Sequence, residues 1–160
     1  MRKIEIKTTF LAYDTDQELP ESERRLLLEA KKRLNIAYAP YSKFQVSAAV
    51  LLANDEIVAS TNYENASYPI SVCAEHSALI AAANRFPGVP PLAVAITVKA
   101  HDKEVGQPAL PCGSCRQVIM ETQMKNGHPI KIILQGETGE VYVFEKGEEI
   151  LPLAFNGSFL

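Results

Sequence analysis

The sequence predicts an α/β fold, a three-layer α/β/α sandwich around a mixed five-stranded sheet. Residues 46–52 and 92–98 are continuous apolar runs, which are typical of strands that helices cover on both faces. Segments with helical spacing of apolar residues alternate with the expected strands along the chain. The last two expected strands, 130–134 and 141–144, are separated by six residues, too few for a crossover helix. This last pair is therefore expected to be antiparallel.

Residues 1–160 are expected to form one domain, because this length is typical of a chain with a single hydrophobic core. Residues 1–20 are expected to be an N-terminal extension of that domain. Within the extension, the stretch from Lys3 to Tyr13 alternates loosely between apolar and polar residues. This pattern indicates a strand or an extended arm.

A helix is expected over residues 21–38, since Pro20 and the acidic residues after it are typical of a helix start. Apolar residues then recur at helical spacing along this segment. Pro40 cannot continue the helix, so the chain is expected to turn there into the strand at 46–52. A polar turn follows, and residues 57–62 are expected to return antiparallel to that strand.

Two further helices are expected to begin at the segments that contain cysteine. Residues 77–83 are strongly helical, which places Cys73 and Glu75 at a helix N-terminus. Cys112 and Cys115 likewise directly precede an apolar helical segment. Between these two helices, the second buried strand is expected to run parallel to its neighbour through a helical crossover.

Composition disfavours several classes of function. The formal net charge is −3, whereas a protein that binds the nucleic-acid backbone needs a basic face. We therefore expect a small-molecule substrate and no nucleic-acid partner. No apolar run is long enough to cross a bilayer, and the N-terminus lacks the pattern of a signal peptide. We expect a soluble cytoplasmic protein with no membrane partner.

All three cysteines of the chain, Cys73, Cys112 and Cys115, fall in two short segments. Three thiolates suit Zn²⁺, which accepts sulfur ligands in a tetrahedron and would keep its fourth corner for water. Glu75 lies two residues after the first cysteine, where an unligated carboxylate can accept and return the protons of that water. We therefore predict a catalytic zinc site with Glu75 as its general acid and base.

Other interpretations of these residues remain open from the sequence. A structural zinc normally has four protein ligands, and His76, His101, His128 or a carboxylate is available as the fourth. The chain would then be a non-catalytic module stabilised by zinc. One disulfide and one buried free thiol would also account for three cysteines, although the Cys-x-x-Cys spacing favours metal binding.

Zinc deaminases share a signature in which Glu stands two residues after a metal ligand and a Pro-Cys-x-x-Cys segment follows later in the chain. This chain has that signature, with Cys rather than His as the first ligand. From about Glu21 to Phe155 the chain resembles the small homotetrameric cytidine deaminases. The resemblance rests on four segments that match in order and spacing, which are 38–44, 62–66, 73–75 and 111–117.

This resemblance implies a cytidine deaminase-like fold and the hydrolytic deamination of cytidine and 2′-deoxycytidine to uridine and 2′-deoxyuridine, a reaction of pyrimidine salvage. It implies one Zn²⁺ per chain on Cys73, Cys112 and Cys115, with Glu75 as the catalytic residue. The backbone N–H of Ala74 would help to hold the reacting centre.

The resemblance also implies a nucleoside site. The family phenylalanine at the position of Phe44 lines the base pocket, although an ordinary core aromatic would fit the sequence equally. Residues at the positions of Asn62 and Glu64 hydrogen-bond the ribose 3′-hydroxyl, and two side chains spaced two apart at a strand end can point to the same side. Phe155 corresponds to a phenylalanine that stacks on the base in a neighbouring subunit, with C-terminal packing as the alternative. The implied assembly is a homotetramer with active sites near subunit interfaces.

Two basic residues are expected to tune the metal. Arg116 can donate a charged hydrogen bond to a thiolate. His76 stands where many cysteine-liganded members of the family carry arginine, and the single N–H of a neutral histidine would compensate the thiolate charge less. A blasticidin-S-type deaminase shares both zinc motifs and is the alternative function. A deaminase that edits nucleic acids is disfavoured by the acidic charge and by the short connection between the last two strands.

Overall fold

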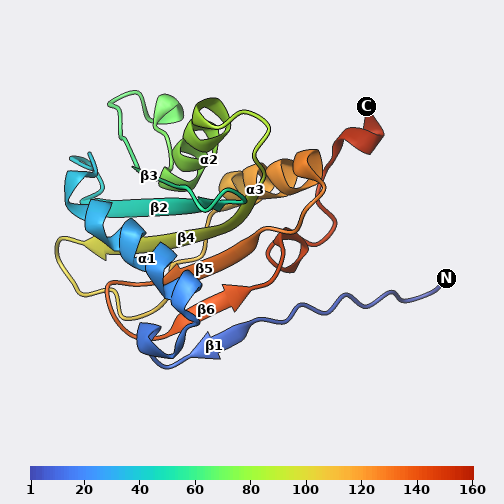
Figure 1. Cartoon of the computed structure of the whole chain (residues 1–160), viewed down its shortest axis with the longest axis horizontal. Helices are drawn as coiled ribbons and strands as arrows, with labels where there is room; N and C mark the ends of the chain where they lie inside the picture. Colours follow the sequence, from blue (N-terminus) through green and yellow to red (C-terminus); the bar gives the residue numbers. More distant parts are fainter.

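The computed structural model describes residues 1–160, and its centre is one mixed sheet of six strands in the order β1-β6-β5-β4-β2-β3 (Figure 1). β4 and β5 are parallel, and every other neighbouring pair is antiparallel. The expected antiparallel arrangement of the last two strands is therefore confirmed. The strands are β1 (Leu11–Tyr13), β2 (Phe44–Leu52), β3 (Ile57–Thr61), β4 (Pro91–Ala100), β5 (Lys131–Gln135) and β6 (Val141–Phe144).

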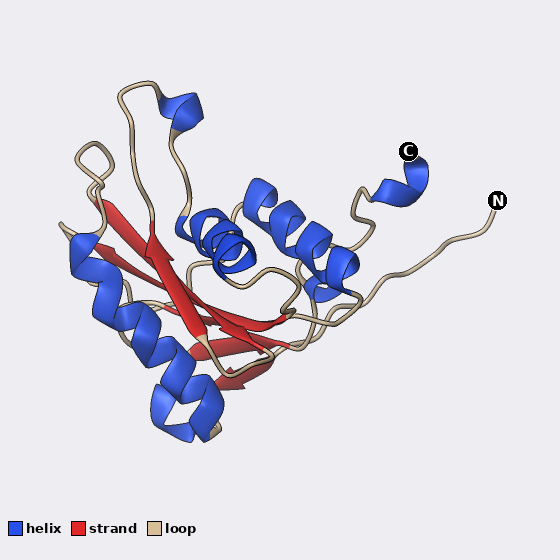
Figure 2. Ribbon diagram, turned by 45° about the horizontal axis from the view of Figure 1, so that its top comes forward, coloured by secondary structure: helices blue, strands red, loops and turns tan.

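Three α-helices cover the two faces of the sheet, which confirms the layered α/β fold (Figure 2). One face carries α1 (Glu21–Arg33), and the other carries α2 (Ala74–Arg85) and α3 (Gly113–Asn126). The expected parallel crossover is the connection from β4 through α3 to β5. On its other side, β4 runs antiparallel to β2. None of the helices is both long and apolar enough to cross a membrane.

The central strands are buried on both faces, which explains their continuous apolar sequences. Along β2, Ala48 and Val50 belong to the core beneath α2 and α3, whereas Ala49 belongs to the core beneath α1. The α1 core includes Leu26 and Leu27, which are fully buried. Because both layers depend on the same strands, the position of β2 and β4 fixes the position of every helix.

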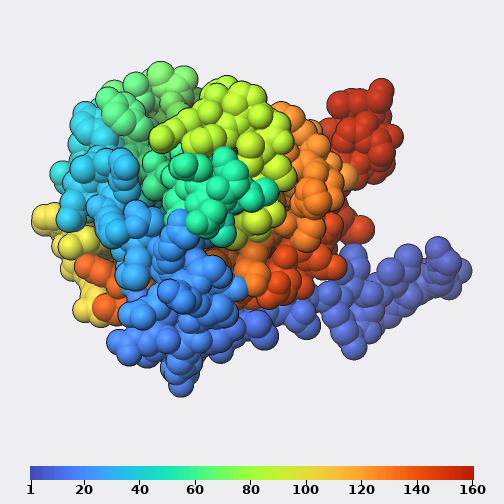
Figure 3. All heavy atoms as spheres, viewed as in Figure 1, coloured from blue at the N-terminus to red at the C-terminus, as the bar shows by residue number.

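The prediction of five strands was wrong, because a sixth strand, β1, pairs with the outer edge of β6. The ring of Phe10 packs 4.7 Å from that of Tyr142 and 5.1 Å from that of Phe144. The Thr8 hydroxyl also donates a hydrogen bond to the carbonyl oxygen of Glu149. These contacts cover a strand edge that would otherwise expose unpaired backbone groups. The residues before them extend away from the body of the protein, as does the C-terminal tail (Figure 3).

The expected end of the first helix at residue 38 was also wrong. The α-helix ends at Arg33, and one 3-10 turn, Leu34–Ile36, continues it. Tyr38 is extended, because its N–H donates to Asn62 O at 3.2 Å and its carbonyl accepts from Glu64 N at 2.9 Å. Pairing with the segment after β3 therefore ends the helix before Pro40 does.

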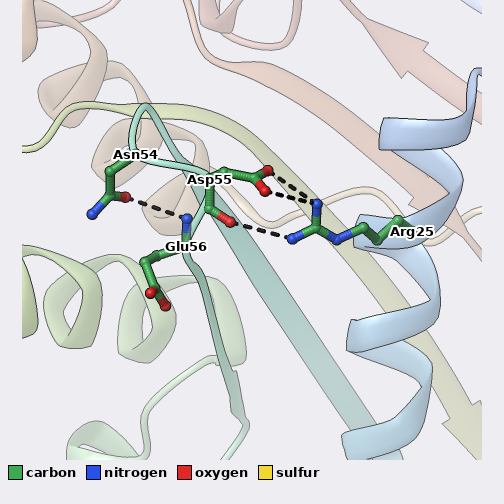
Figure 4. Close-up of polar contacts among 4 residues, drawn as sticks. All are labelled: Arg25, Asn54, Asp55 and Glu56. Carbon is green, nitrogen blue, oxygen red and sulfur yellow. Dashed lines mark hydrogen bonds and ion pairs between the residues drawn. The ribbon is translucent and has the colours of Figure 1, made fainter.

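A bidentate ion pair joins α1 to the turn between β2 and β3 (Figure 4). Arg25 Nη1 lies 3.0 Å and 3.1 Å from the two carboxylate oxygens of Asp55, and Nη2 donates to the Asp55 carbonyl oxygen. Asp55 has a left-handed backbone, with φ of 65°. Both side chains are exposed, so the pair orients the turn but contributes at most about 1 kcal/mol to stability.

Candidate active site

Three sulfur atoms meet where two helices begin. Cys73 and Cys112 directly precede α2 and α3, and Cys115 lies in the first turn of α3. Their Sγ atoms all lie within 4.8 Å of one another. A tetrahedral Zn²⁺ with Zn–S bonds of about 2.3 Å needs sulfur separations of roughly 3.8 Å, so the three thiols fit this ion. No fourth His, Cys, Asp or Glu belongs to the cluster, which suits a catalytic rather than a structural zinc.

Hydrogen bonding favours ionisation of one of the three thiols. The Cys115 thiol donates to the Cys73 sulfur, and this bond lowers the pKa of Cys73 to about 7. The same bond, together with burial, raises the pKa of Cys115. The N-termini of α2 and α3 add partial positive charge beside the sulfurs. Cys73 is therefore the thiol best suited to ionise before the metal binds, whereas zinc ligation would require all three as thiolates.

Glu75 lies in the first turn of α2 and lines the same cavity as the three cysteines. It is only 5% exposed, and it is not part of the sulfur cluster. Burial raises the pKa of its carboxyl group, and a hydrogen bond with Cys115 opposes that shift. A carboxyl group with a raised pKa beside a metal site is well placed to accept and return protons.

The cavity beside Glu75 has a volume of about 290 Å³ and opens to solvent. Its size and its mostly apolar walls are typical of a small-molecule site. All three cysteines and Glu75 line it, so the metal site and the cavity form one chamber. The other side chains on its walls come from β2, β4, the segment after β3 and the segment before α3, and they include Phe44, Val46, Asn62, Glu64, Ile96, Val98, Ala109 and Leu110.

Comparison with known proteins identifies the family. The family model described as the cytidine and deoxycytidylate deaminase zinc-binding region matches residues 20–127. The chain belongs to this family. The match includes Glu75 and all three cysteines, so the chain is a zinc-dependent deaminase, and the resemblance found in the sequence is confirmed. The first nineteen residues lie outside the matched segment.

Individual deaminases agree with the family assignment. A cytidine deaminase from Halalkalibacterium halodurans is 40% identical over 134 residues, which cover 83% of this chain and 94% of that protein. One from Mycobacterium tuberculosis is 39% identical over 98 residues, which cover 59% of this chain and 69% of that protein. The crystal structure of cytidine deaminase from Burkholderia pseudomallei superposes with a TM-score of 0.71 at 35% identity, covering 82% of this chain and 97% of that chain.

Asn62 and Glu64 of the deaminase chamber both bond to the backbone around the start of β2. Asn62 Oδ1 accepts from Val46 N at 2.8 Å, and its Nδ2 donates to Phe44 O at 2.9 Å. Glu64 Oε2 accepts from Tyr41 N at 2.8 Å and from Ser42 N. Burial acts to raise the pKa of Glu64, but hydrogen bonds from the Ser42 hydroxyl and from these two N–H groups outweigh it and lower the pKa. Both side chains line the chamber, and their role toward a ribose stays a prediction.

Phe44 and Phe155, the two phenylalanines expected at the base, lie in different surroundings. Phe44 is half-buried on the chamber wall. Phe155 lies outside the chamber of its own chain, is 59% exposed and stacks on Phe159 at 5.6 Å. Ala74, whose N–H was expected to hold the reacting centre, is buried as the first residue of α2. The placement of Phe155 leaves its ring accessible to another chain.

The two basic residues expected to tune the metal bond elsewhere or lie exposed. Arg116 Nε donates to the Pro111 carbonyl oxygen at 2.7 Å, and Nη1 donates to the Ile150 carbonyl oxygen at 3.0 Å. These bonds hold the residue before Cys112 rather than a sulfur atom. His76 is exposed on the first turn of α2, outside the chamber lining.

The apolar floor of the chamber was not predicted from the sequence. Val46 and Val98 are directly paired across β2 and β4, and Ile96 follows on the same face of β4. Strand alternation could have identified them, because they lie at even spacing from Phe44 or from each other. Without knowledge of the β2–β4 pairing, however, this register could not be assigned.

Proposed function

We propose that the chain catalyses the hydrolytic deamination of cytidine and 2′-deoxycytidine to uridine and 2′-deoxyuridine, with release of ammonia. The observation that carries this proposal is that a buried, unligated glutamate and a three-sulfur metal site line one small chamber. Relatives that bear the name cytidine deaminase, at up to 40% identity over most of the chain, support the choice of substrate.

The chemistry divides between the ion and Glu75. Zinc bound by Cys73, Cys112 and Cys115 would supply a water molecule of lowered pKa at its fourth position. Glu75 accepts a proton from the attacking water and delivers it to N3 of the cytosine ring, so that oxygen adds at C4. Glu75 then passes the second proton of that water to the departing amino group, and the C4–N bond breaks to give ammonia. The net change is the addition of water and the loss of ammonia.

The remaining chamber residues hold the nucleoside. Phe44, Val46 and Val98 provide apolar contacts for the base and exclude bulk water. Asn62 and Glu64 are fixed by their backbone bonds at the same wall, where they offer further hydrogen-bonding capacity to the ribose hydroxyl groups. The preorganised positions of these two side chains reduce the entropy lost on binding.

The proposed assembly is a homotetramer in which Phe155 reaches the active site of a neighbouring subunit. The exposed apolar side chains of the tail, including Leu153, Phe155 and Phe159, support an interface there. We further propose a cytoplasmic location, because three free thiols at a metal site suit a reducing compartment. Light scattering after gel filtration measures the mass of the assembly.

Ammonia release tests the proposed function. The zinc-loaded chain, with close to one zinc per chain by metal analysis, is expected to release ammonia from cytidine. A chelator that removes the metal should abolish the activity, and added Zn²⁺ should restore it. A fully zinc-loaded chain that leaves cytidine intact would refute the proposal. Turnover of blasticidin S under the same conditions would then support the alternative deaminase.

A further inference from the structure

The segment between β4 and α3 forms one wall of the chamber but has little structure of its own. This β4–α3 loop, residues 101–112, contains no helix or strand. Its last part places Ala109, Leu110 and Pro111 on the chamber wall directly before the ligand Cys112. Between residues 102 and 111, the only backbone–backbone hydrogen bonds are two that the Val105 carbonyl oxygen accepts. The end of the loop is held by Arg116 Nε, which donates to the Pro111 carbonyl oxygen, so the position of its middle depends on what donates the two bonds to Val105.

The donors lie in the β5–β6 turn, residues 136–140. Glu137 N donates to Val105 O at 2.7 Å, and Thr138 N donates to the same oxygen at 3.4 Å. The Thr138 hydroxyl also donates to the Glu104 carboxylate at 2.5 Å. The turn that connects β5 to β6 thus also holds the middle of the β4–α3 loop.

Two glycines allow this turn to approach the loop closely. A Cβ atom at Gly136 would overlap the Val105 carbonyl oxygen and lie 2.7 Å from the Gln107 carbonyl oxygen. A Cβ atom at Gly139 would overlap the Gly106 carbonyl oxygen. Gly139 also has a left-handed backbone, with φ of 81°, whereas Gly136 does not, so space alone requires glycine at position 136. The atoms in the way are backbone atoms, which cannot rotate aside as side chains do.

The turn is itself fixed to β4, which carries part of the chamber floor, and to the end of β5. The hydroxyl of Thr97, a fully buried residue of β4, donates to the Gly136 carbonyl oxygen at 2.9 Å. Gln135 Nε2 donates to the Gly139 carbonyl oxygen at 2.8 Å. Thr97 lies between the floor residues Ile96 and Val98. The floor of the chamber and the turn that holds the β4–α3 loop are therefore both attached to β4.

We propose that Gly136, Gly139 and Thr138 are positioning residues for the deamination reaction: the β5–β6 turn sets the distance between the wall at Ala109 and Leu110 and the reacting groups at Glu75. The activity measurements that test this inference rest on the proposed function, because they use cytidine as the substrate. A side chain at either glycine would displace the loop by roughly 1 Å, and a displacement of that size at an active site can cost on the order of 100-fold in rate.

The glycines are tested by alanine substitution, with a control matched for backbone strain. Gly88 has φ of 78°, close to that of Gly139, but nothing lies within 4 Å of its Cβ position. Gly139→Ala and Gly136→Ala are expected to retain one zinc per chain and to lose about 10- to 100-fold in kcat/KM for cytidine, mostly in kcat. Gly88→Ala should carry similar strain and keep the wild-type kcat/KM. Equal kcat/KM for Gly139→Ala and Gly88→Ala would overturn the inference, as would zinc loss in proportion to activity.

A milder pair of variants tests the same contact without a steric clash. Thr138→Val removes the hydroxyl that bonds Glu104 and is expected to lower kcat several-fold, whereas Thr138→Ser keeps the hydroxyl and should restore it. A serine variant as slow as the valine variant would contradict the role of this bond.

Hydrogen exchange separates a failure of this inference from a failure of the proposed function. The amides of Glu137 and Thr138 donate to Val105, so they should exchange faster in Gly136→Ala than in the wild type or in Gly88→Ala. Unchanged exchange would overturn the positioning role. A wild-type chain inactive on cytidine would refute only the substrate assignment, because the exchange measurement needs no substrate.

Discussion

Two glutamates with little-exposed side chains, one on each face of the sheet, have opposite surroundings. On the α1 face, Glu23 has only 11% of its side chain exposed and pairs with Lys131 at 2.5 Å. On the other face, Glu75 is more deeply buried and has no ion pair. Burial raises the pKa of Glu75, because removing the charged carboxylate from water costs free energy. The rest of the fold must offset that cost. An unpaired buried carboxyl is tolerated where chemistry uses it, whereas a paired one serves the structure.

The largest expected effect comes from neutralising the unpaired glutamate. Glu75→Gln should lower kcat for cytidine on the order of 10³- to 10⁴-fold, because both proton transfers pass through this carboxyl group. Zinc content should stay near one per chain, and the unfolding midpoint should not fall, because an amide is easier to bury than a carboxylate. Kinetics, metal analysis and thermal denaturation measure these three quantities.

Glu23→Gln is the matched control, since it makes the same chemical change on the α1 face. It removes the charge that pairs with Lys131 and should lower stability while kcat is kept. A Glu75→Gln protein that is fully active, or a Glu23→Gln protein that has lost its activity while folded, would break the contrast between the two faces.

An intermediate effect is expected from the apolar packing of the α1 face. Leu26 is fully buried there, and Leu26→Ala should cost about 2–5 kcal/mol of stability without changing kcat or KM of the folded protein. Leu28, on the same helix, is 38% exposed, so Leu28→Ala should cost distinctly less. Urea unfolding at one protein and zinc concentration compares the two variants. Equal losses would show that the α1 face does not carry the packing assigned to it.

The smallest expected effect concerns Glu64, whose pKa is shifted in the direction opposite to that of Glu75. Its hydrogen bonds lower the pKa below the usual value of 4.5, so they stabilise the folded state above pH 4.5. This contribution is lost as the pH falls through the lowered pKa. The difference in melting temperature between wild type and Glu64→Gln should therefore shrink as the pH drops below 4.5. Acid loss of zinc affects both proteins alike, and a constant difference would contradict the assigned bonds.

Sequence periodicity predicted the central strands and helix starts, but not the bounds of the elements at the edges of the fold. The apolar runs of β2 and β4 are long enough to specify buried strands by themselves. The loose alternation from Lys3 to Tyr13 predicted a strand or an extended arm, but only Leu11–Tyr13 pairs, because those three residues lie beside β6. The end of α1 was placed too late for a related reason, since the pairing of Tyr38 with the segment after β3 is a tertiary contact.

The candidate site was predictable where function fixes residue types at short spacing. Cys73 and Glu75 share one helical turn, so local spacing was enough to identify them. The bonds of Arg116 to Pro111 and Ile150 were not predictable, because they depend on how the C-terminal segment returns to α3. Gly136 lies in an ordinary-looking turn sequence, and its close approach to Val105 exists only in three dimensions.

The two halves of the metal site are separated along the chain by α2 and β4. A ribosome that has released the polypeptide only as far as β4 has exposed one of the three sulfurs. Full capture of the ion must therefore wait until the first turn of α3 has emerged, which makes metal loading a late event in biosynthesis. The zinc content of a preparation accordingly measures the fraction of molecules in which the starts of α2 and α3 lie side by side.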